Sequence, residues 1–426
     1  MCVVCFCSGY NFRSPFGFSV QLFDYFDSTQ IVCLSLLLIS ISSSAGLLIL
    51  LLGLQRVFSI APSLAASPVA DLPDTSLCVV IPAYNEVDNI GPCLSSVLDS
   101  DPPCTDWQVL VVDDESSDAT AERVTALLDE RGTNAPICRL LRAGARPSAE
   151  RWVGKNWACT RAMEEVSSRW VLFIDADVRL RPEALRRALA QASCEEADLF
   201  SLAPRLSCGC LAEWMVQPIM ASLLGLGFPI EAANDPSSEV AFAAGPFMLF
   251  RRSAYDSVGG HRALASEVVE DLALAKRIKS AGFRLRYLLG LDAVDLRMYA
   301  DLPSLWEGWT KNWFIGLDRD VSKALGASGV VVLMFSVPWL QFPAALVLLL
   351  LLPQMSLWWL LLLGLSLLAI AQQLLLRFWQ RRRFDVPLTN WWLMGAGGLL
   401  LGAIGPVSVW RTLTGRGWTW KGRQLA

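Results

Sequence analysis

The stretch "WVLFIDADVRLRP" (Trp170–Pro182) joins an apolar run directly to two acidic residues. Residues 170–173 have the continuous apolar character of a strand that is buried on both faces. Asp175 and Asp177 follow at once, and "RPEALRRALAQA" then has helical character with Pro182 in its first turn. Both a solvated turn and a metal- and phosphate-binding site fit this pattern, so the rest of the chain has to decide.

The same order of elements occurs twice earlier in the chain. "LCVVI" (Leu77–Ile81) runs into "PAYNE", and "WQVLVV" runs into "DDESSDAT", with a helix expected from about Ser117–Thr120. Strand, polar turn and helix, three times over, predict an α/β fold with a mainly parallel sheet. Ligands of such sheets bind beyond the carboxyl ends of the strands. We therefore expect Tyr84–Glu86, Asp113–Asp118 and Asp175–Asp177 to meet at one edge.

The composition indicates a membrane protein with a globular insert. Of 426 residues 54% are hydrophobic, and the mean hydropathy is +0.42. Each of four uncharged apolar runs exceeds the roughly 20 residues that a helix needs to cross a bilayer: Ile31–Leu54, Gly329–Leu352, Ser356–Leu376 and Asn390–Trp410. The predicted organisation is an N-terminal extension (1–30), a transmembrane helix (31–54), a globular domain (71–326), three membrane segments (329–411) and a basic tail (412–426).

Basic residues next to the apolar runs favour a cytoplasmic domain in a bacterial inner or intracellular membrane. Arg56 follows the first run, and Arg377 and Arg381–Arg383 follow the third. The basic tail would also prefer the inside, which four simple crossings do not allow. One segment could therefore be re-entrant, either the second, with its prolines, or the last, with "GAGG". A net charge of −4 without a broad basic patch argues against a nucleic-acid partner.

The acidic turns suit an anionic ligand only if a cation accompanies it. Bare carboxylates would repel a nucleoside diphosphate, whereas Mg²⁺ or Mn²⁺ binds carboxylate and phosphate oxygens together. A D-x-D pattern alone is common by chance. A later stretch, "SEVVEDLALAKRIKSAG", predicts a helix with Ser266 as its cap, Glu270 and Asp271 in its first turns, and Gly282 at its end.

Four motifs in order, "VVIPAYNE", "VLVVDDESSDAT", "FIDADV" and "VVEDLALAKRIKSAG", resemble family 2 glycosyltransferases of the GT-A fold. The resemblance implies that Asp177 binds the metal, that Asp175 lies nearer the sugar nucleotide, and that Asp271 is the catalytic base beside Glu270. Lys155 resembles part of a "GK" stretch in membrane-bound relatives, where it would meet phosphate; simple solvation is the alternative. The nucleotide-binding positions implied are Pro82, Ala83, Tyr84, Glu86 and Asp114.

A carboxylate base and a hydroxyl acceptor indicate a single inverting displacement. The "Q-x-x-R-W" motif of processive synthases is missing, and "GGHRALASEVVEDLALAKRIKSAGF" and "GRGWTWKGRQ" resemble bacterial carotenoid glycosyltransferases. The expectation is transfer of one sugar from a UDP- or GDP-sugar to a lipid hydroxyl, with a carotenoid favoured. Hopanoid- or ceramide-type transfer, a polyprenyl-phosphate sugar synthase and a non-catalytic scaffold are the alternatives. Acceptor contacts could come from His261, Trp309 and Trp313; the equally open alternatives are packing for His261 and a place at the membrane interface for the tryptophans.

Overall fold

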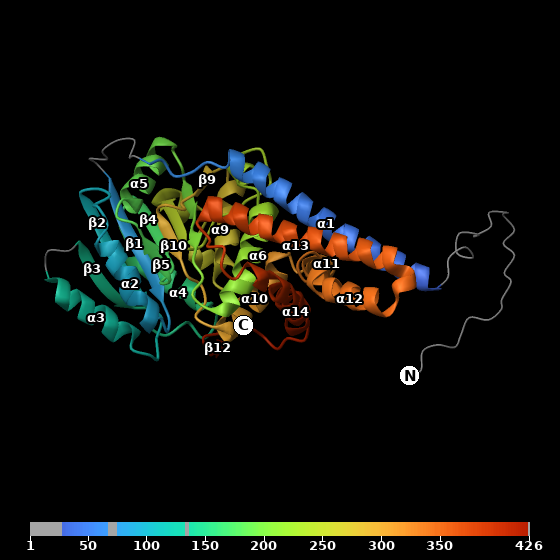
Figure 1. The fold of residues 1–426 in the computed structure, drawn as a ribbon. Helices are drawn as coiled ribbons and strands as arrows, with labels where there is room; N and C mark the ends of the chain where they lie inside the picture. Colours follow the sequence, from blue (N-terminus) through green and yellow to red (C-terminus); the bar gives the residue numbers. More distant parts are fainter. Residues whose placement is uncertain (1–27, 67–74, 133–135, 425–426) are drawn as a thin grey trace, which may run out of the picture.

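The computed structural model describes residues 28–66, 75–132 and 136–424, so most of the expected extension lies outside the described residues. Its centre is a seven-stranded sheet in the order β3-β2-β1-β4-β8-β6-β9 (Figure 1). β1 to β4 are parallel, and β8 runs antiparallel to both β4 and β6. These strands are β1 Ser76–Ala83, β2 Asp106–Asp113, β3 Ile137–Arg142, β4 Trp170–Ile174, β6 Leu199–Ala203, β8 Phe247–Arg251 and β9 Leu285–Leu289.

A small second sheet, in the order β5-β10-β7, lies beside the main one. It consists of β5 Val178–Leu180, β10 Val294–Leu296 and β7 Arg205–Leu206. Helices of the globular part are α2 Val87–Leu98, α3 Thr120–Arg131, α4 Gly154–Glu165, α5 Ala184–Cys194, α6 Leu211–Gly227, α7 Ile230–Asn234, α8 Arg252–Ser257, η2 His261–Leu264, α9 Glu270–Ser280 and α10 Leu302–Gly316.

Both faces of the sheet are covered, as the continuous apolar strands predict. Val79 and Ile81 of β1 pack in one cluster with α2, α3 and α5. Cys78 and Val80 point the other way, into a cluster that holds α4 and α9 and continues into the helices beyond the sheet. The alternation of side chains along a strand produces this split. The strands expected at Leu77–Ile81, at Trp107–Val112 and at Trp170–Phe173 are confirmed.

The helix that carries Glu270 and Asp271 begins later than expected. Ser266 is not its cap: α9 starts at Glu270, with Val269 in the capping position. Its end is as predicted, because Ala281 caps it and Gly282 follows with φ +81°. The two acids therefore occupy the first turn, next to the free backbone N–H groups of the helix.

Four helical stretches are long and apolar enough to cross a membrane: Gln30–Ile60, Val321–Leu351, Pro353–Phe384 and Trp391–Leu413. They contain α1 Ser28–Ile60, α11 Val321–Val331, α12 Val337–Leu351, α13 Ser356–Phe384 and α14 Met394–Leu413, with short turns η4 Pro353–Met355 and η5 Trp391–Leu393. A π-helical turn, η3 Val332–Ser336, separates α11 from α12. Pro338 follows it by two residues, in the first turn of α12, which fits a break in the helix.

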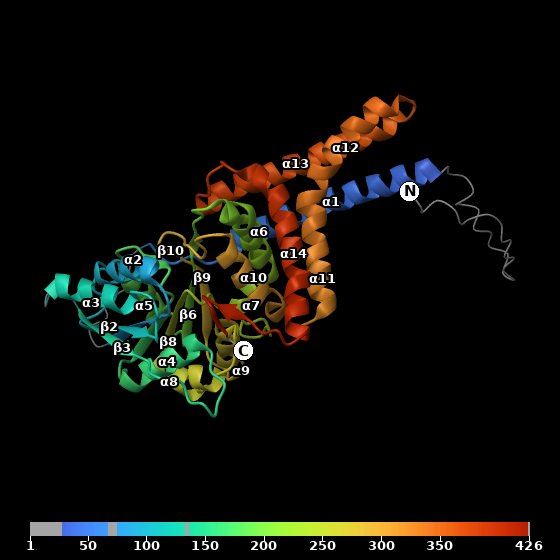
Figure 2. The same cartoon turned by 90° about the horizontal axis from the view of Figure 1, so that it is seen from below.

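The two halves of the second stretch have different neighbours. Figure 2 shows α1, α12 and α13 extending together away from the sheet, whereas α11 and α14 lie side by side near the domain. α6 and α10 lie between this pair and the sheet, and both contact α14. After α14 the chain returns to the domain as a two-stranded hairpin, β11 Thr419–Trp420 and β12 Arg423–Gln424.

Candidate functional site

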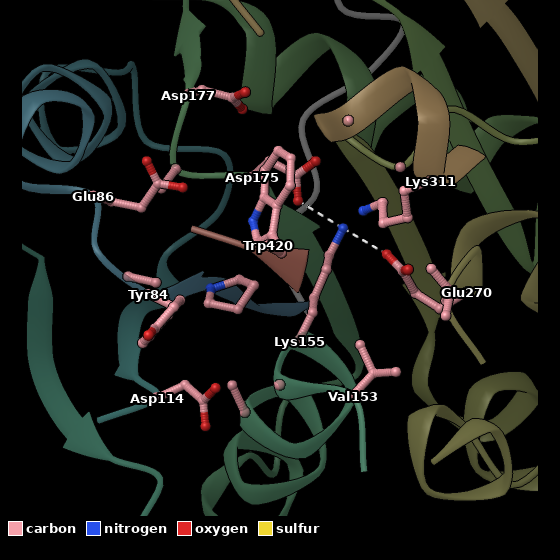
Figure 3. A pocket seen from close by; sticks show the side chains of 18 of the residues that line it. Tyr84, Glu86, Asp114, Val153, Lys155, Asp175, Asp177, Glu270, Lys311 and Trp420 are labelled. Carbon is pink, nitrogen blue, oxygen red and sulfur yellow. Dashed lines mark ion pairs between the residues drawn. The ribbon is translucent and has the colours of Figure 1, made fainter. Parts of the chain in front are cut away.

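A cavity of about 280 Å³ lies beyond the carboxyl ends of β1, β2 and β4. The three polar turns predicted to meet do so, since Tyr84, Glu86, Asp114, Asp175 and Asp177 all line it (Figure 3). α4, α9, α10 and the C-terminal hairpin form the other walls. The parallel order of β2, β1 and β4 brings these turns together from distant parts of the sequence.

Asp114 lies at the end of β2 and is held by two arginines. Its backbone N–H donates to the carbonyl of Ala83 at 2.9 Å, and its Oδ2 accepts from Arg146 at 2.5 Å and from Arg423 at 2.6 Å. Burial raises the pKa of Asp114, although both guanidinium groups oppose this. Its Oδ1 is buried and lacks a hydrogen-bond partner among the described residues. One oxygen of Asp114 therefore has unused hydrogen-bonding capacity.

Tyr84 and Glu86 follow β1 and face the hairpin. The guanidinium of Arg423 lies 3.8 Å from the centre of the Tyr84 ring. The Nζ of Lys421 is 2.6 Å from Glu86 Oε1, and it also donates to the carbonyl of Asn85 at 2.8 Å. This part of the cavity thus combines an aromatic face, carboxylates and cations.

The two acids of "DAD" have different surroundings. Asp175 forms an ion pair of 2.6 Å with Lys155. Asp177 Oδ1 is buried with no hydrogen-bond partner in the part of the chain that the structure describes. Burial, then Asp175 and Glu86, holds the pKa of Asp177 well above its usual range. A divalent cation fits here, because it would give this oxygen a partner and offset the surrounding negative charge.

The protein residues alone do not form a closed metal cage. Across the described ranges, His, Cys, Asp and Glu side chains nowhere form a group of three or more suited to holding a metal ion. A site with few protein ligands suits Mg²⁺, which commonly binds one or two carboxylates and completes its coordination shell with water and phosphate oxygens.

Lys155 connects the "DAD" turn to the acids of α9. Its Nζ is 2.6 Å from Asp175 and 2.6 Å from Glu270 Oε1, as the dashed lines in Figure 3 show. Burial would raise the pKa of Glu270, but the charge and hydrogen bond of Lys155 outweigh it, and the net shift is downward. Lys155 is therefore part of the site, and the solvated alternative does not describe it.

Asp271 also lines the cavity. Its Oδ2 accepts from the backbone N–H of Gly245 at 3.2 Å, and its Oδ1 from that of Leu272 at 2.8 Å. Burial, then the charge of Glu270, raises the pKa of Asp271 to about 6. A helix start alone would favour the ionised form, but here desolvation and a neighbouring carboxylate outweigh the helix terminus.

The structure does not bring the expected acceptor residues to the cavity. His261 is buried, with its Nδ1 2.7 Å from the hydroxyl of Tyr255 and its ring against Phe173. Trp309 donates to Gln217 at 2.9 Å, and Trp313 to the carbonyl of Ala324 at 3.1 Å, both in buried positions. All three side chains serve packing, and we do not assign acceptor binding to them.

Several cavity residues were missed by sequence reasoning. The α10 side chains in the cavity are Lys311 and Asn312 rather than the tryptophans beside them. Trp420 and Arg423 come from the tail, whose charge and whose "GRGWTWKGRQ" stretch alone do not show that it reaches the cavity. Its mixture of aromatic and basic residues in "GWTWKGR" was the available signal. A further charged addition is Arg146, from the loop after β3.

Comparison with known families agrees with this geometry. A model described as "Glycosyl transferase family 2" matches residues 78–259, and one described as "Glycosyl transferase family group 2" matches residues 170–402. This chain belongs to glycosyl transferase family group 2. Together the two matches cover almost all of the sheet, most residues of the cavity and two of the four apolar helical stretches in full, and they identify the protein as a glycosyltransferase.

The curated relatives include 4,4'-diaponeurosporenoate glycosyltransferase of Staphylococcus aureus strain USA300, which is 28% identical over 255 residues, or 59% of this chain and 64% of that protein. The chain thus spans 64% of that relative's length. Solved structures include the mannosyltransferase PcManGT from Pyrobaculum calidifontis with GDP-Man and Mn²⁺ (18% identity, 86% and 98% of the chains covered, TM-score 0.49). Another is S. aureus TarS 1-349 with UDP-GlcNAc (15% identity, 81% of this chain and 93% of that chain covered, TM-score 0.40).

Proposed function

We propose that this glycosyltransferase moves one sugar from a UDP- or GDP-sugar to the hydroxyl of a membrane lipid, with inversion at the anomeric carbon. The observation that carries the proposal is the gathering of Tyr84, Asp114, Asp177 and Asp271 around one cavity. A nucleotide-binding edge and a candidate base then face the same space. One displacement needs both and requires no covalent intermediate.

The residues have separate roles in this proposal. Pro82, Ala83, Tyr84, Glu86 and Asp114 bind the nucleoside, with the unpartnered Asp114 oxygen as an acceptor for its N–H or O–H groups. Asp175 and Lys155 bind the sugar–diphosphate end. Asp177, whose buried Oδ1 has no hydrogen-bond partner among the described residues, holds Mg²⁺ or Mn²⁺. When bound, the metal offsets the charge of the diphosphate.

Asp271 takes the proton of the acceptor hydroxyl. A base needs a pKa near the working pH, and a value of about 6 leaves Asp271 mostly ionised at pH 7 while still basic enough to accept a proton. Gly245 fixes its position through the backbone N–H. Glu270 stays ionised beside Lys155 and acts on Asp271 through its charge. A polyprenyl-phosphate acceptor is already an anion and would need no such base.

The acceptor is proposed to come from the membrane side, and a carotenoid is the favoured lipid. α10 contributes Gly308, Lys311 and Asn312 to the cavity and also packs against α14. Apolar residues of the cavity wall include Val268, Val269 and Met298. The carotenoid-glycosyltransferase relative supports the choice, while hopanoid and ceramide lipids have the same hydroxyl chemistry. The domain is proposed to face the cytoplasm, where nucleotide sugars are made available.

The test is lipid and pigment profiling of a strain that lacks the gene. Complementation with the wild-type chain should restore a glycosylated carotenoid, and complementation with Asp271→Asn should leave the free hydroxyl form. Loss of a hopanoid or ceramide glycoside would replace the carotenoid assignment. Loss of a polyprenyl-phosphate sugar alone would contradict the hydroxyl acceptor.

A further inference from the structure

The C-terminal hairpin (Trp418–Arg423) returns from α14 to the cavity with a defined geometry. Lys421 and Gly422 have φ of 48° and 81°, as a two-residue type I′ turn requires. The turn pairs Trp420 directly with Arg423. Residues opposite each other in an antiparallel pair point to the same face. Both side chains therefore enter the cavity, and Figure 3 shows Trp420 near its centre.

The hairpin is attached at several points and is not a loose end. The Lys421 N–H donates to Glu307 Oε2 of α10 at 3.2 Å. The Nζ of Lys311 lies 4.6 Å from the centre of the Trp420 ring. Trp418 is only 5% exposed and packs against Val153 at the start of α4. These contacts tie the hairpin both to the domain and to the helices near the membrane.

The two cations of the hairpin approach the acids of the nucleotide end. Arg423 donates to Asp114 at 2.6 Å and lies over Tyr84, and Lys421 pairs with Glu86 at 2.6 Å. Both residues thus touch the side chains that the proposed function assigns to the donor.

Charge in the cavity explains why the hairpin would matter. The carboxylates that line it are Glu86, Asp114, Asp175, Asp177, Glu270 and Asp271. Opposing cations from the domain and α10 are Arg146, Lys155 and Lys311. Without Lys421 and Arg423, carboxylates outnumber cations by two to one, and even a divalent ion would leave a net negative cavity. An anionic nucleoside diphosphate would be repelled from it.

The hairpin and a donor can occupy the site together. Arg423 uses Oδ2 of Asp114, whereas the buried Oδ1 has no partner within the described ranges. Arg146 binds the same Oδ2, so Asp114 stays neutralised if Arg423 shifts towards a phosphate. The hairpin therefore lines the donor site, and it does not have to move out of the cavity before a donor can bind.

We propose that the C-terminal hairpin is part of the donor site, with Lys421 and Arg423 as binding residues for the nucleoside diphosphate. This inference rests on the proposed function. They neutralise Glu86 and Asp114 and supply positive charge beside the phosphates. Donor binding would then depend on a segment that follows the last membrane helix and lies far in sequence from the sheet.

Binding of UDP and GDP to the full-length chain, in detergent with Mn²⁺, tests this inference by calorimetry. Lys421→Gln and Arg423→Gln should each weaken the affinity for the better-bound diphosphate roughly tenfold, and the double substitution more. The charge-conserving Lys421→Arg and Arg423→Lys should recover most of the loss. Binding of the uncharged nucleoside should change much less than binding of the diphosphate.

Arg416→Gln is the matched control, because Arg416 lies in the same tail but stacks on Trp410 at 4.2 Å. It should bind like the wild-type chain. Unchanged or tighter diphosphate binding in both Gln variants would overturn the inference while leaving the proposed function intact. A wild-type chain that binds neither UDP nor GDP would overturn the proposed function and the inference with it.

Discussion

At the scale of single residues, Lys155 determines how the two halves of the site are related. It is 2.6 Å from both Asp175 and Glu270, and thereby separates the carboxylate that is proposed to meet the donor from those proposed to act on the acceptor. Its charge keeps Glu270 ionised. Asp271, which is one residue further along α9, receives the repulsion of Glu270 and becomes the more basic acid.

Replacing Asp271 by Asn keeps the shape and removes the base. We expect sugar transfer to fall by roughly 10²–10⁴-fold, because a positioned base contributes about that much. Binding of UDP or GDP should stay near the wild-type value, since Asp271 makes its hydrogen bonds to Gly245 and Leu272 and not to the residues assigned to the nucleoside. Transfer at the wild-type rate would exclude Asp271 as the base.

The pH dependence of transfer should report the same carboxyl group. A base acts in its ionised form, and burial and Glu270 raise the pKa of Asp271 to about 6. The rate should therefore be near its maximum at pH 7–8 and fall about tenfold for each pH unit below pH 6. Diphosphate affinity measured at the same pH values separates this effect from loss of donor. A rate that stays flat down to pH 5 would contradict the assignment.

At the scale of elements, α4 can approach the end of β2 only through a glycine. A Cβ on Gly154 would lie 2.3 Å from Asp114 Oδ2 and 2.8 Å from a guanidinium nitrogen of Arg146. Gly154→Ala should therefore displace Asp114 and weaken diphosphate binding roughly tenfold, which is about 1.4 kcal/mol. Gly316→Ala is the control, because nothing lies within 4 Å of its added Cβ. Equal affinity in the two variants would count against the nucleotide role of Asp114.

The sequence predicts what depends on local pattern and misses what depends on distant contacts. The strands ending at Ala83, Asp113 and Ile174 follow from apolar runs, and parallel order places their acids together. Arg423 pairs with Asp114 across 309 positions, and short-range periodicity carries no information about such a pair. The sequence also does not distinguish a place at the membrane interface from a buried helix face for Trp309 and Trp313, because both environments favour tryptophan.

At the scale of the whole molecule, the hairpin constrains the membrane topology. Its contacts with Glu86 and Asp114 place the tail on the same side as the domain. The chain after α10 must then cross the membrane an even number of times. We expect η3 and α12 together (residues 332–351) to cross outward and α13 to return, while α14 stays with α6, α10 and α11 near the domain (Figure 2). This arrangement places the basic tail on the same side as the domain without a third crossing after α10.

Cysteine labelling in intact cells can test this topology. Single cysteines are introduced into a variant that lacks the native cysteines. Gln354→Cys reports on the turn between α12 and α13, Thr414→Cys on the tail and Ser237→Cys on the domain. All three positions are exposed. An impermeant maleimide should label only Gln354→Cys. Lysed cells, in which all three should react, are the control. Labelling of Thr414→Cys in intact cells would show that α14 crosses, and labelling of Ser237→Cys that the domain faces outward.

A structure of the full-length chain with a nucleoside diphosphate and Mn²⁺ would show directly whether acids from separate motifs form one donor site. The nucleoside should contact Tyr84 and Asp114, the diphosphate and metal should lie at Asp177, and Asp271 should face the open phosphate end. A nucleotide bound outside this cavity, or one that reaches Asp114 with its phosphates directed away from Asp177, would contradict the account.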